Sequence, residues 1–343
     1  MHLNDFQFYL PPDLIARYPL AERTDSRLLC PDKTTGSKFI HRRFSDLIDL
    51  VAAGDLLIFN NTQVIPARLF GQKTTGGQVE LLVERVLDNQ RILAQVRVSK
   101  KPRVGETLIF PQGVRFEILN RHQQFYTLRY NGGDRTVLDI IEAIGQIPLP
   151  PYMHRLAEES DKERYQTVYA TSKGSVAAPT AGFHFDKNLL EQLQANQVHM
   201  GYLTLHIGAG TFAPVRVENI YEHKMHSEYL EVSEELCVQI RETKKRGNRV
   251  IAVGTTSLRA LETASQGGEV APYYGETRIF IYPGYQFHCV DALITNMHLP
   301  GSTLLMLVSA FGGHEYIMQA YHEAIAKSYR FYSYGDAMWI ERF

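Results

Sequence analysis

The chain has 343 residues, more than a single hydrophobic core usually supports, so we expect two domains. Its 44% hydrophobic and 21% charged residues are typical of a globular protein, and a net charge of −1 excludes a chain-wide attraction to nucleic acid or membrane. No apolar run is long enough to cross a bilayer, and an N-terminus with Asp5 and no basic segment predicts no signal peptide.

The first 60 or so residues alternate between short apolar segments and polar turns. Residues 6–10 follow a period of two, which predicts a short strand, while residues 44–51 predict a helix and residues 55–59 a buried strand. Asn60 and Asn61 end that strand. Asparagine is typical of turns, but these amides would equally suit a binding site at the end of the strand, so both interpretations stay open.

From residue 64 to residue 146 the chain is rich in β-forming residues. Turn signals separate five predicted strands, at 79–83, 92–98, 107–110, 114–119 and 125–130. Such even spacing indicates a small antiparallel barrel or sandwich. A short helix over 137–144 follows, and then Pro148, Pro150 and Pro151, which predict a return to the first domain. We therefore expect residues 64–151 to be a β domain inserted into a larger α/β domain, made of residues 1–63 and 152–343.

The insert carries the cations that a polyanionic partner would need. It holds 12 Lys or Arg against 8 Asp or Glu, and four of these cations cluster: Arg97, Lys100, Lys101 and Arg103. Phosphate neutralisation requires such clusters. The alternative is an ordinary solvated loop.

After the insert, helices and strands alternate as in α/β proteins. Asp186 and Ser233 are predicted N-caps of helices, and two more helices are expected after Ser302. Strands are predicted at 249–253, 278–282 and 286–293. The aromatic tail, residues 329–338, favours core packing over the alternative of stacking on unpaired bases.

The stretch from Tyr202 to Arg216 predicts a strand that ends at Gly208 and Gly210. Without a Cβ, a glycine lets the backbone approach a ligand closely, although a hairpin between two buried strands is the alternative. A Rossmann-type glycine loop is excluded because β-branched Val215 and Val217 follow where that motif requires a helix.

Other polar residues also follow predicted buried strands. Thr255, Thr256 and Ser257 open a helix, whose free backbone N–H groups favour an anion, with simple N-capping as the alternative. Ligands of α/β folds bind beyond the ends of strands, so we expect these polar loops to converge on one cleft.

Three histidines lie in these loops: His184, His206 and His298. One buried histidine is usually structural, but three beside glycine-rich loops indicate acid–base chemistry. His223 and His226 have no third ligand near them in sequence, so no metal site is expected.

Six long segments together resemble the S-adenosylmethionine:tRNA ribosyltransferase-isomerases of queuosine synthesis. They are FNNTQVIPARLFG (59–71), AAPTAGFHF (177–185), LTLHIGAGTFAPVR (203–216), VIAVGTTSLRALE (250–262), DALITNMHLPGSTLLMLVSAF (291–311) and YRFYSYGDAM (329–338). The segments are specific, and the resemblance runs nearly from end to end.

The resemblance implies an α/β fold in which a discontinuous, barrel-like main domain carries an inserted antiparallel β-barrel. It implies transfer and isomerisation of the ribosyl group of S-adenosylmethionine onto 7-aminomethyl-7-deazaguanine at the wobble position of a tRNA with a GUN anticodon. The products would be epoxyqueuosine-tRNA, adenine and methionine. S-adenosylmethionine would be a substrate, with no metal or other cofactor. The distant cysteines, Cys30, Cys237 and Cys289, favour a reducing cytoplasm, and we expect a monomer.

This chemistry needs a base for the ribose C5′ proton, which the sulfonium acidifies, and an acid for adenine departure. We expect His184 or His298 as the base and Asp291 as the acid or an orienting group. Helix-start hydroxyls and Arg259 would hold the methionine carboxylate, and an aromatic ring would face the sulfonium. The expected substrate-binding residues are Asn60, Asn61, Phe183, His206, Gly208, Gly210, Thr211, Thr255, Thr256, Ser257, Arg259 and Asn296. The basic cluster of the insert would contact tRNA phosphates.

Two other classes of protein stay open. An RNA methyltransferase would transfer the methyl group of S-adenosylmethionine, and a noncatalytic RNA-binding protein would consume none of it. The number of polar loops at strand ends argues against the second class.

Overall fold

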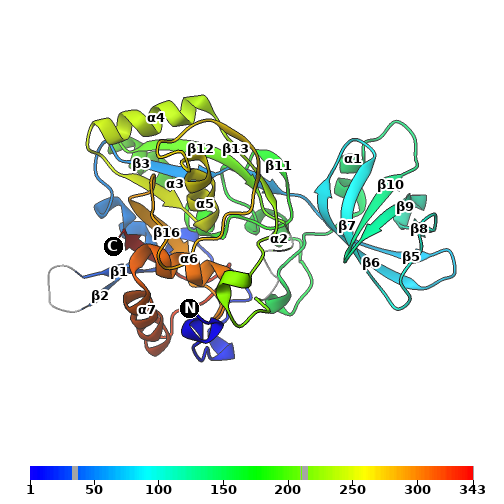
Figure 1. Cartoon of the computed structure of the whole chain (residues 1–343), viewed down its shortest axis with the longest axis horizontal. Coiled ribbons are helices and arrows are strands. Elements are labelled where there is room, and N and C mark those ends of the chain that lie inside the picture. The colour runs from blue at the N-terminus through cyan, green and yellow to red at the C-terminus, as the bar shows by residue number, and fades with distance from the viewer. Residues whose placement is uncertain (33–37, 209, 211–214, 343) are drawn as a thin grey trace.

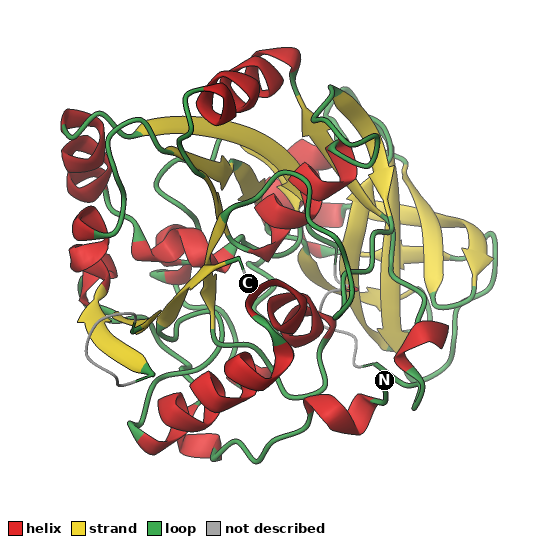
Figure 2. Cartoon of the chain, turned by 60° about the vertical axis from the view of Figure 1, so that its left-hand side comes forward, coloured by secondary structure: helices red, strands yellow, loops and turns green. Residues whose placement is uncertain are grey.

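A nine-stranded mixed sheet forms the centre of the molecule in the computed structural model, which describes residues 1–32, 38–208, 210 and 215–342 (Figures 1 and 2). In spatial order its strands are β15 (Tyr273–Thr277), β13 (Glu228–Val232), β12 (His199–His206), β3 (Leu56–Asn60), β14 (Val250–Val253), β16 (Ala292–Asn296), β17 (Ala337–Glu341), β1 (Arg27–Pro31) and β2 (Phe39–Arg43). Four central neighbours, β12, β3, β14 and β16, run parallel, so their carboxyl ends lie at one edge of the sheet.

The central strand β3 shows why this sheet is covered on both faces. All five of its residues are buried, as expected of a parallel strand between two layers. Leu56 and Ile58 belong to one hydrophobic core, whereas Leu57 and Phe59 belong to a second. Helices of the first core are α4 (Glu234–Lys245), α5 (Thr255–Ala264), α6 (Thr303–Gly312) and α7 (His314–Ala326). The second core contains α3 (Lys187–Ala195) and the 3-10 helix η4 (Phe44–Asp49).

A closed antiparallel barrel forms the other end of the molecule (Figure 1). Its strands are β5 (Arg68–Lys73), β6 (Gln78–Val86), β7 (Arg91–Val98), β8 (Thr107–Ile109), β9 (Arg115–His122) and β10 (Phe125–Tyr130). The barrel has a hydrophobic core of its own, and helix α1 (Val137–Ile144) packs against that core. The predicted α/β fold with an inserted antiparallel barrel is confirmed. The domain boundaries at 64 and 151 stay a prediction.

Short elements join the barrel to the sheet. Strands β4 (Thr62–Val64) and β11 (Ser172–Ser175) pair in parallel, and α2 (Asp161–Arg164) lies between the barrel and β11 in the chain. Within the described ranges, none of the helices combines the length and apolar character that a membrane crossing requires.

Several predicted elements differ from the structure. The helix expected over 44–51 is the 3-10 helix η4. The strand expected at 6–10 does not form: Phe6 ends the 3-10 helix η1 (Leu3–Phe6), and residues 7–10 are irregular. The strand predicted at 278–282 is wrong. Ile279 and Ile281 are both buried in the core, which produces the alternating pattern, but no strand among the described residues pairs with this segment. Strand β5 escaped prediction because its one fully buried side chain, Leu69, gives no alternating pattern.

Candidate active site

A cavity of about 380 Å³ lies at the carboxyl ends of β14 and β16. Its wall is built from segments that are distant in sequence. They are the segment after the barrel, residues 177–181 at the start of the 3-10 helix η7 (Thr180–His184), the start of α5, the end of β16 and the tail loop 330–336. Parallel strands bring these segments together because their carboxyl ends share one edge. The cavity therefore occupies the place where an α/β fold usually binds its ligand.

The start of α5 gives the cavity an anion-binding wall. Thr255 and Thr256 line it together with Arg259, which is 4% exposed. One guanidinium nitrogen of Arg259, Nη1, pairs with the buried Glu228, while Nε and Nη2 have no hydrogen-bond partner among the described residues. A buried cation with unused donors beside a helix N-terminus favours a carboxylate or phosphate.

The end of β16 supplies an amide and an imidazole. Asn296 Nδ2 donates to the carbonyl oxygen of Tyr332 at 2.9 Å, and its Oδ1 lies 3.4 Å from Thr180 Oγ1. His298 Nε2 lies 2.7 Å from Thr295 Oγ1. Burial lowers the pKa of His298 to about 3, so its ring is neutral at neutral pH.

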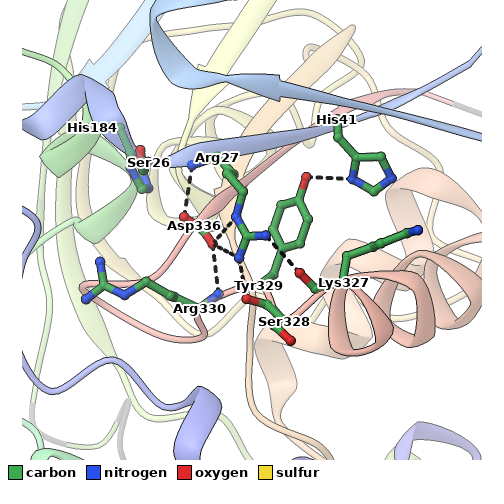
Figure 3. Close-up of polar contacts among 9 residues, drawn as sticks. All are labelled: Ser26, Arg27, His41, His184, Lys327, Ser328, Tyr329, Arg330 and Asp336. Carbon is green, nitrogen blue, oxygen red and sulfur yellow. Dashed lines mark hydrogen bonds and ion pairs between the residues drawn. The ribbon is translucent and has the colours of Figure 1, made fainter.

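His184 lies behind this wall rather than on it. It lines a smaller hollow that shares only Ser333 with the large cavity among the described residues. Its Nδ1 is 2.6 Å from Ser26 Oγ, and its ring stacks on Phe44 at a centroid distance of 4.8 Å (Figure 3 shows Ser26 beside His184). Burial lowers the pKa of His184 to about 3; the nearby Asn296 side chain opposes this shift without making a regular hydrogen bond to Nε2.

The tail loop is fixed by the buried carboxylate of Asp336. Its oxygens accept from the backbone N–H of Arg27 at 2.9 Å and of Arg330 at 2.8 Å, and from the Arg27 guanidinium at 3.1 Å (Figure 3). This arrangement holds the turn that presents Tyr332 and Ser333 to the cavity.

Several residues expected in the site lie elsewhere. Asp291 precedes β16, and its carboxylate accepts from the backbone N–H of Val250 at 2.9 Å, so it lies at the amino end of the strand, away from the cavity. It was predicted as the acid or an orienting group, and the structure places it just before the first residue of β16. Ser257 is fully buried and donates to the carbonyl oxygen of Val253 at 2.8 Å, and Phe183 packs between Tyr165 and Tyr334.

The two asparagines at the end of β3, Asn60 within the strand and Asn61 just after it, hold strands together. Asn60 is fully buried: its Oδ1 accepts from the backbone N–H of Leu205 at 3.0 Å, and its Nδ2 donates to the carbonyl oxygen of the same residue at 2.9 Å. Asn61 Oδ1 accepts from Thr204 Oγ1 at 2.7 Å. Neither residue lines the large cavity among the described residues.

His206 and Gly208 lie together in a second cavity, where the barrel meets the sheet. At Gly208 the group that approaches the backbone is the Glu84 carboxylate, and at Gly210 it is the His226 ring. The close approach predicted at these glycines is therefore made by side chains of the protein. Thr211 lies outside the described residues.

The basic cluster lies on the barrel. The Arg97 side chain, on β7, is 89% exposed, and Lys100, Lys101 and Arg103 follow in an exposed turn. Strand β7 lies at the opposite end of the molecule from α7 (Figure 1), and the four residues do not line either of these two cavities.

Sequence reasoning missed several residues of the cavity wall: Tyr152, Thr180, Tyr332 and Ser333. Thr180 stands in the segment AAPTAGFHF beside the predicted His184, which was the available signal. Tyr332 and Ser333 belong to an aromatic tail that favoured core packing. Nothing local to Tyr152 distinguishes it from the proline hinge that precedes it.

Comparisons with known proteins agree along the whole chain. The family model described as "Queuosine biosynthesis protein" matches residues 3–340. A relative from Nitrosococcus oceani, named S-adenosylmethionine:tRNA ribosyltransferase-isomerase, is 56% identical over 340 residues, which are 99% of this chain and 98% of the relative. A crystal structure of S-adenosylmethionine tRNA ribosyltransferase from Thermotoga maritima is similar with a TM-score of 0.56 and 34% identity, over 98% of this chain and 99% of that chain.

Proposed function

Because the chain belongs to the queuosine biosynthesis protein family, we propose that it is an S-adenosylmethionine:tRNA ribosyltransferase-isomerase. In this proposal it moves and isomerises the ribosyl group of S-adenosylmethionine onto 7-aminomethyl-7-deazaguanine in tRNA. The products are epoxyqueuosine-tRNA, adenine and methionine.

The observation that carries the proposal for this site is the anion-binding wall inside the large cavity. S-adenosylmethionine carries a carboxylate, and Arg259 has two guanidinium nitrogens unused by described residues beside the start of α5. A carboxylate accepts two parallel hydrogen bonds from a guanidinium. We therefore place the methionine part of the substrate against Arg259, Thr255 and Thr256, which leaves its ribose and adenine toward the end of β16.

The reaction needs a neutral group that accepts the proton from the ribose C5′. His298 is the imidazole among the described residues of the cavity wall. Its lowered pKa keeps it neutral and also makes it a weaker base than a free histidine, so its role as base requires that the bound substrate raise this pKa. His184 is the alternative, since its Nε2 is buried and has no hydrogen-bond partner among the described residues. When Ser26 Oγ donates to the carbonyl oxygen of Arg23, 3.3 Å away, it accepts from Nδ1, and Nε2 keeps the lone pair that a base needs.

Single substitutions separate the two histidines. The variant that removes the base, His298→Ala or His184→Ala, should lose activity by about 100-fold or more while its Kd for S-adenosylmethionine changes little. His322→Ala, an exposed change on α7, is the control. If both variants keep near-normal turnover, neither imidazole is the base.

The activity itself is tested by mixing the protein with S-adenosylmethionine and tRNA that carries the aminomethyl-deazaguanine. We expect free adenine in step with a ribosyl-sized mass gain on the tRNA. A methyl-sized gain together with S-adenosylhomocysteine would instead identify an RNA methyltransferase.

The remaining expectations belong to the same proposal. The acceptor is a tRNA with a GUN anticodon, the barrel's basic cluster meets its phosphates, and S-adenosylmethionine is consumed without a metal or prosthetic group. We propose that the enzyme works as a monomer in the cytoplasm. The buried, unpaired state of Cys30, Cys237 and Cys289 is compatible with a reducing compartment.

A further inference from the structure

The second cavity lies between the barrel and the large sheet and has a volume of about 310 Å³. The barrel strand β6 contributes Glu84 and Arg85 to its wall, and the sheet contributes His206 and Tyr229. Ile207 belongs to the walls of both cavities, so the second cavity adjoins the one in which we place S-adenosylmethionine.

An aromatic surface forms one side of the second cavity. The rings of His206 and Tyr229, from the neighbouring strands β12 and β13, are nearly parallel, with an interplanar angle of 20° and centroids 6.3 Å apart. Thr62 Oγ1 lies 2.8 Å from His206 Nδ1 and holds that ring in place. Aromatic rings of this kind are the surfaces on which proteins stack unpaired bases.

Hydrogen-bonding groups of both signs face the same space. The Glu84 carboxylate rests against the backbone of Gly208, where a Cβ would collide with it. The wall also contains two cations, and each forms an ion pair with an acid outside the wall: Arg85 with Glu276 at 2.5 Å and Lys173 with Glu142 at 2.6 Å. Among the described residues of the wall, Glu84 is the one that carries a carboxylate.

We propose that the second cavity binds the guanine-like base of the acceptor tRNA, turned out of its stack, with Glu84 accepting hydrogen bonds from N1–H and the 2-amino group. This inference rests on the proposed function and names the base site that the reaction requires. A carboxylate offers about four acceptor positions, so Glu84 can receive two donors from the base while keeping other contacts. Extrusion of a base is the usual way in which an enzyme reaches a base atom in folded nucleic acid.

The orientation that this contact imposes suits the chemistry. The N1 and 2-amino edge of a deazaguanine lies opposite the carbon that bears the 7-aminomethyl group. A base held by Glu84 therefore directs its aminomethyl group away from the barrel strand. Because Ile207 separates the two cavities, this amine would pass that residue to reach the ribosyl group in the first cavity.

The test compares two tRNAs whose wobble position carries either 7-aminomethyl-7-deazaguanine or its analogue without the 2-amino group. The unchanged enzyme should prefer the first by roughly 10- to 100-fold in kcat/KM, the range expected of a bidentate contact to a base. Glu84→Gln should reduce this preference to less than about threefold, because an amide cannot accept both donors. Its Kd for S-adenosylmethionine should stay unchanged. Glu117→Gln, on β9 of the same barrel, is the matched control and should keep the preference.

The outcomes separate this inference from the proposed function. If the unchanged enzyme releases no adenine with either tRNA, the proposed function fails. If it is active and Glu84→Gln keeps the full preference, the base site alone is wrong. A lower KM for both tRNAs in Glu84→Gln would mean that the cavity binds a phosphate through Arg85 and Lys173, because loss of the carboxylate removes a repulsion, and it would also overturn the base site.

A second variant keeps the inference testable if Glu84→Gln does not fold. Tyr229→Ala removes the aromatic surface and should raise the KM for tRNA about 10-fold or more, whereas Tyr229→Phe should keep it near the original value. An unchanged KM in Tyr229→Ala would overturn the proposal.

Discussion

Arg259 serves the core and the cavity at once. Its burial demands a partner, because an isolated charge in the interior is costly, and Glu228 on β13 supplies it. The pair uses one guanidinium nitrogen, and Nε and Nη2 have no hydrogen-bond partner among the described residues. In our proposal these two nitrogens bind the substrate carboxylate, and the pair with Glu228 holds the guanidinium in place beforehand, which reduces the ordering cost of binding.

Replacing Arg259 by lysine tests this role. Arg259→Lys keeps the positive charge and a contact with Glu228 but loses the fork that holds a carboxylate. We expect the Kd for S-adenosylmethionine to rise roughly 10- to 100-fold, since a hydrogen bond to a charged group contributes about 1.5–3 kcal/mol. Titration calorimetry measures it. Arg249→Lys, in the Arg249–Asp55 pair before β14, is the control. Equal Kd values for both variants would contradict a carboxylate site at Arg259.

Two histidines with lowered pKa values, the buried His184 and the partly buried His298, predict how stability depends on pH. Burial lowers the pKa of His184 and His298 to about 3, whereas an unfolded histidine has a pKa of about 6.5. Below pH 6.5 these histidines bind protons in the unfolded chain but stay neutral in the folded chain. The free energy of unfolding therefore falls as the pH falls from 6.5 toward 3. Each histidine contributes up to about 1.4 kcal/mol per pH unit in that window and nothing above it.

Denaturant unfolding at pH 5 and pH 7 checks this dependence. His184→Gln should reduce the difference between the two free energies of unfolding, because one buried imidazole is gone, whereas the exposed His322→Gln should not. A pH difference that both variants share with the unchanged protein would show that His184 does not titrate in this way.

At the scale of elements, helix α5 contributes its first turn to the wall of the large cavity. Gly254 precedes the helix with a backbone φ of +90°, a value that residues other than glycine rarely adopt. The turn at Gly254 directs Thr255 and Thr256 toward the cavity. All ten residues of α5 are buried, so the sheet and neighbouring helices fix its direction. The anion-binding wall is thus a property of the whole strand–turn–helix unit.

Gly254→Ala should disturb that unit. Space around a new Cβ is adequate, with the nearest atom, Ala181 Cβ, at 3.5 Å, so the cost comes from the backbone conformation. We expect a loss of about 1–2 kcal/mol in the free energy of unfolding and weaker binding of S-adenosylmethionine. Gly267→Ala, just after the same helix, has neither a positive φ nor a close neighbour and should change little. Denaturant unfolding and titration with S-adenosylmethionine measure both quantities in the two variants. Equal free energies of unfolding and equal Kd values in Gly254→Ala and Gly267→Ala would contradict backbone strain at Gly254.

At the scale of the whole molecule, the barrel lies beside the sheet (Figures 1 and 2), and both contribute to the second cavity. The exposed basic cluster belongs to β7 and the turn that follows it. In our proposals the barrel binds tRNA phosphates and one base enters the cavity at the junction with the sheet. Phosphate contacts position a nucleic acid, and base contacts specify it.

Removing the basic cluster should weaken tRNA binding without affecting S-adenosylmethionine. Changing Arg97, Lys100, Lys101 and Arg103 to Gln should lower tRNA affinity and reduce the slope of log affinity against log salt by up to about three, because each phosphate contact contributes about 0.7–0.9. Changing Lys245 and Arg246, at the end of α4, is the control. If the slope stays the same, tRNA does not lie on this face of the barrel.

The sequence by itself determined the class of fold and the barrel, and it singled out Thr255, Thr256, Arg259 and Asn296, which line the large cavity. Alternating apolar residues and turns predicted the barrel strands because periodicity is a local property of the chain. The hydroxyls of Thr255 and Thr256 and the cation of Arg259 were found because they stand directly after a buried strand, where a parallel sheet must place them. The resemblance in six segments gave the family, which the family model and the relative from Nitrosococcus oceani confirm.

Only the tertiary structure decided which polar residues are structural. Asn60 has its amide satisfied by β12, and Asp291 lies at the amino end of β16, because strand register and pairing fix the direction and partners of each side chain. The junction of Glu84 with His206 and Tyr229 joins segments more than a hundred residues apart, so no local pattern could reveal it. Local sequence determines elements, whereas the packing of the barrel against the sheet determines which side chains share a cavity.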